Sequence, residues 1–178
     1  MRAVKLILAC AASAVMAGCA VAPHQDRLTQ PQSEVPSAEQ AKVAQATAEQ
    51  INKLWLPAKT TFALAVALSP QDAFGNALVE NLRQSGTGIV TCFEYREGGT
   101  KDNPSAKPAV VEVVPLAEAL GEAKKLTWDF KPVAECKAGE PCLYRVTVHV
   151  DSQVLGRAYE QKEGVLNPVG VWSLFSEE

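Results

Sequence analysis

The chain has 178 residues, of which 47% are hydrophobic and 21% are charged, and its formal net charge is -3. This composition is typical of a globular domain and excludes a largely disordered chain. The part after residue 18 carries 15 basic against 20 acidic side chains without a cluster of Lys and Arg, so no nucleic-acid-binding surface is expected.

The first 18 residues have the pattern of a bacterial lipoprotein signal peptide. Arg2 and Lys5 form a short positive region, and the eleven residues Leu6–Met16 are apolar. A run of that length suits the core of a signal peptide and is too short to span a bilayer. It ends in Met16-Ala17-Gly18-Cys19, which places a thiol directly after the cleavage site. We therefore predict lipidation of Cys19; the alternative is an ordinary secretory signal with a coincidental cysteine.

Acyl chains on Cys19, palmitate among them, would anchor the protein with roughly 0.8 kcal/mol for each buried CH₂ group. Ala20 follows the cysteine, where an aspartate would favour retention in the inner membrane. We therefore expect a lipid anchor in the outer membrane, with the folded part on the periplasmic side. Residues 19–36 contain three prolines and many Gln, Ser and Thr, which predicts a flexible tether.

Three cysteines remain beyond the anchor. Cys136 and Cys142 flank a turn-rich stretch, so a local disulfide between them is plausible in an oxidising compartment. Cys92 would then be a buried thiol or a partner in an intermolecular bond. Neither a CxxC nor an HxxxH spacing occurs, so the sequence predicts no metal site, and we expect no cofactor.

The first half of the remaining chain predicts alternating helices and strands. Residues 37–57 are rich in Ala, Gln and Glu and predict a linking helix, with Ser37 as its N-cap and Pro57 as its stop. Residues 62–68 alternate as in a strand. A capping box, Ser69-x-x-Asp72, then predicts a helix that ends at Gly86, and residues 89–95 are again strand-like.

The second half predicts mostly strands after a polar loop at 98–108. The expected elements are a short strand at 110–114, a short helix at 116–125, an extended segment at 126–133, and strands at 143–150, 154–159 and 169–175. The strand at 143–150 has the clearest alternation. We therefore predict an α+β globular domain at 58–178, with one main helix packed on a small antiparallel or mixed sheet.

The sequence offers little chemistry for an enzyme. Only His149 could act as a general base outside the tether, and no GxSxG, P-loop, HExxH or dinucleotide fingerprint occurs. A hydrolase built from Cys92 and His149 is a formal alternative. We predict that the protein is not an enzyme.

Several stretches, in this order, resemble the TrbH lipoproteins of conjugative type IV secretion systems. They are QINKLWLPAKT at 50–60, DAFGNALVENLR at 72–83, LYRVTV at 143–148, RAY at 157–159 and PVGVW at 168–172. The likeness covers roughly residues 38–175. The chain differs from the family pattern in a longer stretch at 98–125, in Cys136 and Cys142, and in its acidic end at 173–178.

The resemblance implies a structural component of the mating-pair formation apparatus, acting beside the outer-membrane ring of channel subunits as part of a ring oligomer. It also implies a fold like the small N-terminal domain of secretins, which is an analogy of fold alone. The alternative function is a binding lipoprotein of the surface-exclusion or inhibitor type.

Overall fold

A computed structural model describes residues 35–96, 109–137 and 140–177. The expected signal peptide, Cys19 and almost all of the expected tether lie outside the described residues, as does the expected polar loop. The elements, in chain order, are α1 (Ser37–Leu54), the 3-10 helix η1 (Pro57–Lys59), β1 (Thr61–Leu64), α2 (Ala73–Gln84), β2 (Gly88–Thr91), β3 (Phe93–Arg96), β4 (Ala109–Glu112), α3 (Leu116–Leu120), β5 (Lys124–Pro132), β6 (Cys142–Val150), β7 (Gln153–Lys162) and β8 (Val165–Ser176).

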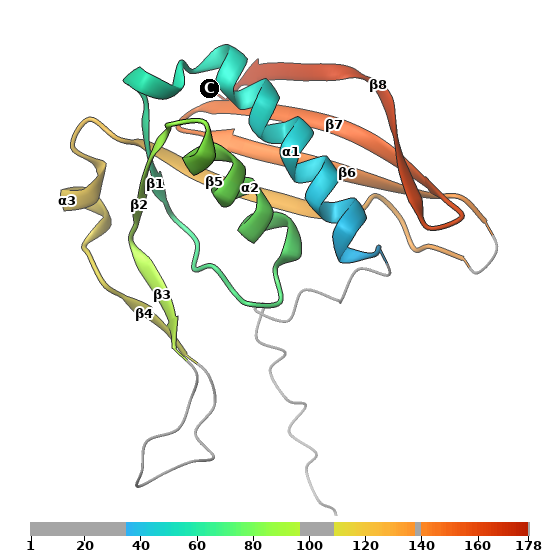
Figure 1. Ribbon diagram of the computed structural model, residues 1–178, viewed down its shortest axis with the longest axis horizontal. Helices are drawn as coiled ribbons and strands as arrows, with labels where there is room; N and C mark the ends of the chain where they lie inside the picture. The colour runs from blue at the N-terminus through green and yellow to red at the C-terminus, as the bar shows by residue number, and fades with distance from the viewer. Residues whose placement is uncertain (1–34, 97–108, 138–139, 178) are drawn as a thin grey trace, which may run out of the picture. The chain divides into compact units, whose positions relative to one another are not determined.

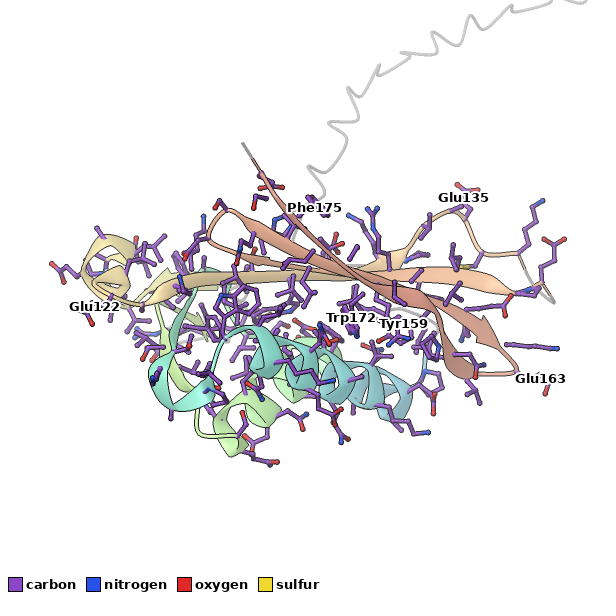
Figure 2. All side chains as sticks on the ribbon, turned by 90° about the horizontal axis from the view of Figure 1, so that it is seen from above. Glu122, Glu135, Tyr159, Glu163, Trp172 and Phe175 are labelled. Atoms are coloured by element: carbon purple, nitrogen blue, oxygen red, sulfur yellow. A yellow bond between two sulfur atoms is a disulfide. The ribbon has the colours of Figure 1, made fainter. Side chains whose placement is uncertain are left out.

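Six strands form one mixed sheet in the order β2-β1-β5-β6-β7-β8. Strand β1 runs parallel to both β2 and β5, whereas β5 to β8 form an antiparallel meander. Strands β3 and β4 make a separate antiparallel pair. Helices α1 and α2 cover one face of the six-stranded sheet, and none of the helices that the structure describes lies on the other face of β5 to β8 (Figures 1 and 2). The predicted α+β class is confirmed.

Helix α1 packs into the core of the domain. Its buried residues include Val43, Ala44, Ala48 and Ile51, which recur at helical spacing and belong to the same cluster as the sheet residues. Trp55 ends the helix and meets Phe62 of β1 edge to face, with ring centroids 6.3 Å apart. Through this buried face, α1 forms part of the layer that covers the sheet.

Helix α2 begins later than its sequence suggests. Asp72 is the N-cap, and its Oδ1 atom accepts a hydrogen bond of 2.7 Å from the amide of Gly75. The predicted start at Ser69 was wrong, because Ser69 forms a turn before the helix, in which its carbonyl accepts from the amide of Asp72. The N-cap expected at Ser37 was also wrong: Pro36 precedes α1 and makes no side-chain cap. The apolar face of α2 is formed by Phe74, Leu78, Val79 and Leu82.

The strand boundaries differ from the prediction in three places. Strand β1 ends at Leu64, and the expected strand at 89–95 is two strands separated at Cys92. The last hairpin is longer than expected, because Glu163 and Gly164 both have positive φ and join β7 to β8 by a two-residue turn. Strand β8 therefore starts at Val165 instead of Val169.

Candidate interaction surface

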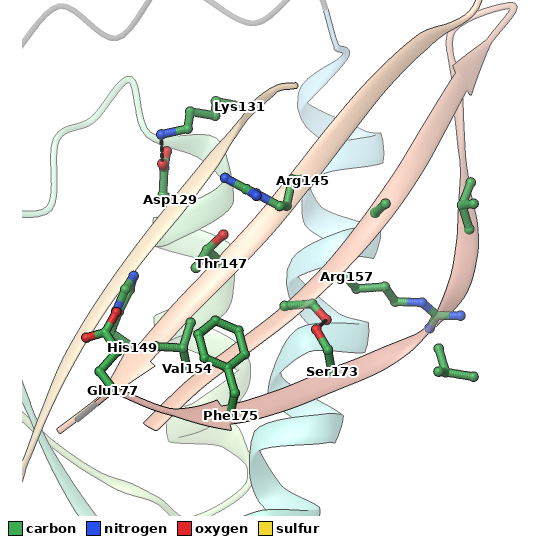
Figure 3. Close-up of a pocket in the computed structure, with 14 residues that line it drawn as sticks. Asp129, Lys131, Arg145, Thr147, His149, Val154, Arg157, Ser173, Phe175 and Glu177 are labelled. Carbon is green, nitrogen blue, oxygen red and sulfur yellow. Dashed lines mark hydrogen bonds and ion pairs between the residues drawn. The ribbon is translucent and has the colours of Figure 1, made fainter. Parts of the chain in front are cut away.

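The face of the sheet without helices is a shallow concave surface with a cavity volume of about 540 Å³. We call it the open face (Figure 3). Its floor comes from β5 and β6 and is polar, whereas its side along β7 and β8 is largely apolar. The lining side chains include Asp129, Lys131, Arg145, Thr147, His149, Val154, Ala158, Val169, Val171, Ser173, Phe175 and Glu177.

Two carboxylates of the open face, Asp129 and Glu177, each lie beside a basic side chain. Lys131 forms an ion pair with Asp129 on the same strand. The Nδ1 atom of His149 lies 3.7 Å from Oε1 of Glu177. Arg145 is exposed and makes no ion pair with any residue that the structure describes. Exposed pairs of this kind contribute little to the stability of the fold.

Strand β8 forms one edge of the sheet and contains an irregularity. Gly156 pairs with Ser173 and Ala158 with Val169, so three residues of β8 lie opposite the single residue Arg157. Such a bulge changes the direction of the side chains at a sheet edge. The apex residue, Val171, is 86% exposed.

Arg157 holds this bulge in place. Its guanidinium donates a hydrogen bond of 3.0 Å to the carbonyl of Gly170, whose φ of 69° favours a glycine. The same guanidinium carbon lies 5.8 Å from the ring centroid of Tyr159 and 5.6 Å from that of Trp172, within cation–π range. Burial raises the pKa of the Tyr159 hydroxyl, and the nearby charge of Arg157 partly offsets that increase.

The first half of β8 is closed on its outer edge. The amide of Leu166 donates to Oε2 of Glu39 at the start of α1, over 3.1 Å. Pro168, two residues further along, has no amide hydrogen to offer. Prolines and covered positions are common ways to protect a sheet edge from unwanted pairing. Neither Glu39 nor Pro168 lies beside the second half of the strand, Val171–Ser176.

The cysteines singled out in the sequence lie in different environments, and one of them is outside the described residues. The structure joins Cys136 and Cys142, whose Cα atoms lie 5.2 Å apart, at the start of β6. Cys19 lies outside the described residues. Cys92 is fully buried, and its burial and the charge of Glu112 raise the pKa of its thiol. A raised pKa keeps the thiol protonated, which is the opposite of what a cysteine nucleophile needs.

The structure also separates the two residues of the hydrolase alternative. Cys92 follows β2, and His149 lies on β6, with β1 and β5 between those strands in the sheet. His149 lines the open face, and Cys92 is not among the residues that line it. The described residues therefore do not assemble the Cys–His pair that this alternative requires.

Sequence reasoning did not find the bulge of β8 or the closed half of its edge. Two signals were present, namely Pro168 and Gly170 within an otherwise strand-like stretch, and the absence of any charged residue from Val165 to Ser176. Proline and glycine inside a strand are typical of an edge strand with an irregularity, whereas a lack of charged residues is unusual at a sheet edge.

Comparison with known proteins identifies one family. The family model for the conjugal transfer protein TrbH matches residues 22–178. No curated protein and no solved structure matches the chain. Among the residues that the structure describes, no helix is long and apolar enough to cross a membrane. The match extends over most of the sequence, and the chain therefore belongs to the TrbH family of conjugal transfer proteins.

Proposed function

We propose that this conjugal transfer protein is an outer-membrane lipoprotein that anchors or stabilises the outer-membrane ring of a conjugative type IV secretion channel. The observation that carries the proposal is the family match over residues 22–178 combined with the signal pattern that ends at Cys19. The match begins three residues after the cysteine that would become the mature N-terminus.

The proposed protein has three parts. Residues 1–18 direct export and are removed, the lipidated Cys19 holds the chain in the membrane, and residues 19–36 serve as a tether. A tether of this composition is flexible and keeps the folded part within a short distance of the anchor. Attachment to the membrane raises the effective concentration of the domain near other membrane-bound subunits, so weak contacts suffice for assembly.

The folded part contributes binding surfaces in this proposal, without a catalytic role. Its open face combines the exposed cation Arg145, which forms no ion pair within the described part of the chain, with an apolar side that includes Val169 and Phe175. Surfaces of mixed polarity with exposed apolar side chains are typical of protein–protein contacts. We expect the channel subunits to dock on this face.

A substitution of the anchoring residue tests this function. Cys19→Ser removes the thiol that accepts lipid, so we expect the protein to leave the membrane fraction and DNA transfer between cells to fall steeply. Cys10→Ser is the matched control, because it removes a cysteine from the signal peptide only and should leave both readouts unchanged. Normal membrane location and normal transfer of the Cys19→Ser protein would contradict the proposal.

The exclusion alternative predicts a different result in the same cells. A recipient that contains only this protein would accept less DNA from a donor if the protein were an exclusion factor. The assembly role predicts that such a recipient accepts DNA normally, and that the defect of Cys19→Ser appears only when the donor carries it.

A further inference from the structure

The second half of β8 is an exposed sheet edge that lacks the usual protection. The stretch Val171–Ser176 contains no charged residue and no proline, although long uncharged edges invite pairing with another strand. Three of its side chains are large, apolar and exposed: Val171 at 86%, Leu174 at 46% and Phe175 at 53%. The contrast with the first half, which Glu39 and Pro168 close, indicates that the second half is the part of the described β8 edge that is available for pairing.

The side chains of this segment divide between the two faces of the sheet. Val171, Ser173 and Phe175 line the open face. Trp172 packs against the core on the opposite face, and the alternation of a strand places Leu174 on that face as well. Figure 2 shows Trp172 on the helix side of β8 and Phe175 on the other side.

We propose that this edge binds the same edge of a second copy of the chain, with the two Val171–Ser176 segments antiparallel around a two-fold axis at Ser173. Residues directly opposite each other in such a pair must point to the same face. With the axis at Ser173, Val171 faces Phe175 of the other copy on the open face. On the helix side, Trp172 faces Leu174.

The segment favours a second copy because it is complementary to itself. Every large apolar side chain of the segment meets another apolar side chain, and no like charges face each other because the segment has none. A two-fold contact of this kind uses the same patch on both subunits. A partner with charged residues along its edge strand would place them against this uncharged edge and lose their hydration.

Five paired residues on each chain, Val171–Phe175, form a small interface. Stable interfaces between proteins generally bury about 1,200–2,000 Å² in total, and a single short strand pair falls below that range. The pairing is therefore weak in dilute solution and rests on the proposed function, since membrane anchoring supplies the high local concentration. This inference deepens the proposed assembly role by naming the partner of one surface.

A cysteine on the two-fold axis reports the pairing directly. Residues opposite each other in antiparallel strands have Cα atoms about 4.5–5.5 Å apart, within the range that a disulfide requires. We expect full-length Ser173→Cys protein in membranes to form a cross-linked homodimer under mild oxidation. Asn167→Cys is the matched control, an exposed position on the closed half of the strand, and should give about tenfold less dimer because the two copies of residue 167 lie too far apart.

Three other outcomes of this experiment would overturn the proposal. They are equal dimer yields from Ser173→Cys and Asn167→Cys, no dimer from Ser173→Cys, and a cross-link from Ser173→Cys to a different protein in place of the homodimer. The unsubstituted chain, which has the same native cysteines, supplies the background in each case.

A charge exchange tests the register in the Ser173→Cys background. Val171→Lys with Phe175→Lys places like charges opposite each other across the two copies, and we expect roughly tenfold less dimer. Val171→Lys with Phe175→Glu removes the same apolar groups but places opposite charges together, so the dimer should persist. Circular dichroism checks that both variants fold, and equal yields from the two would overturn the proposed register.

The outcome of the Ser173→Cys cross-linking experiment can be distinguished from the outcome of the Cys19→Ser anchoring test. Cross-linking is scored on the chain itself and needs no DNA transfer, and Cys19→Ser protein concentrated after purification should still form the Ser173→Cys dimer. A dimer together with normal transfer by Cys19→Ser would contradict the anchoring role alone. A transfer defect without any dimer would contradict this inference alone.

Discussion

The carboxylate of Glu39 accepts a hydrogen bond from the backbone amide of Leu166, 127 positions further along the chain. This contact ties the first turn of α1 to β8, which is an edge strand in the described sheet, and provides an acceptor for the buried amide of Leu166. Lys42 donates to the other oxygen of the same carboxylate. A single acidic side chain therefore links the N-terminal helix to the last strand.

Loss of the Glu39 carboxylate should loosen both elements. We expect Glu39→Ala to lower the free energy of unfolding and to speed hydrogen exchange at the amide of Leu166, because that amide loses its acceptor. Glu39→Gln keeps an oxygen acceptor and should have a smaller effect. Hydrogen exchange followed by NMR measures the amide directly, and unchanged exchange at Leu166 in Glu39→Ala would contradict this account.

The same contact predicts a pH dependence. The hydrogen bonds from Lys42 and from the amide of Leu166 hold the pKa of Glu39 below its ordinary value of 4.5. A carboxylate with a lowered pKa stabilises the folded state fully above the pKa of the unfolded chain, and this contribution is lost as the pH falls through the pKa of the folded protein. Urea unfolding from pH 7 down to pH 3 should therefore show a loss of stability that is smaller in Glu39→Gln. If the free energy of unfolding fell with pH equally in the unsubstituted protein and in Glu39→Gln, the prediction would be contradicted.

Gly75 should tolerate no side chain. A Cβ atom there would lie 2.6 Å from the indole of Trp128 and closer still to the carboxylate of Asp72, which accepts hydrogen bonds from both the Gly75 amide and the Trp128 indole. We expect Gly75→Ala to destabilise the domain by about 1–3 kcal/mol in urea unfolding, as overpacking does. At an ordinary helical glycine, the same change increases the free energy of unfolding by up to about 1 kcal/mol. The sign of the measured change in stability therefore shows whether the close contacts at Gly75 dominate. Glu80→Ala, at an exposed position of α2, is the control and should change stability by less than about 0.5 kcal/mol.

Arg157 should set the order of the bulge in β8. Arg157→Ala removes the donor to Gly170 and the cation beside the Trp172 ring. We expect a loss of about 1–2 kcal/mol in stability and faster hydrogen exchange in the peptide 165–176, since a charged hydrogen bond and a cation–π contact are both lost. Arg157→Lys retains the charge without the planar guanidinium. Its stability and its exchange rate should lie between those of the unsubstituted protein and Arg157→Ala. If hydrogen exchange in the peptide 165–176 were the same in Arg157→Ala as in the unsubstituted protein, other contacts would have to hold the bulge.

The bond between Cys136 and Cys142 should stabilise the hairpin region modestly. The two residues are six positions apart, and the chain-entropy treatment gives about 2 kcal/mol for so short a loop. We expect Cys136→Ser with Cys142→Ser to lower stability by about that amount and to make the domain insensitive to reductant. If reductant destabilised that double variant as much as it destabilises the native protein, another thiol pair would be responsible.

The sequence predicted best the elements whose pattern is local. The strand at 143–150 was found because its buried residues alternate with exposed or partly buried ones, as a half-buried antiparallel strand requires. The helices were found from composition and apolar spacing, but their first residues were misplaced because Ser37 and Ser69 resemble caps without acting as such.

The features that depend on tertiary contacts could not be predicted. Strand β8 lies at an edge and exposes most of its residues on both faces, so it lacks the alternation that marks a half-buried strand. Its pairing with Glu39 joins residues 127 positions apart, which no local pattern encodes. The open face could not be predicted for the same reason. Strands β5 to β8 bring together side chains that form no recognisable motif in the sequence. Cys19 was predicted from a local motif and stays a prediction.

The central claim of this account is that the protein is held at the outer membrane through Cys19, and the mass of its mature N-terminus tests that claim most directly. The account predicts that mass spectrometry of the protein extracted from the outer-membrane fraction finds a first peptide that begins at Cys19 and carries acyl chains. An unmodified cysteine in a protein recovered from the soluble periplasmic extract would contradict it.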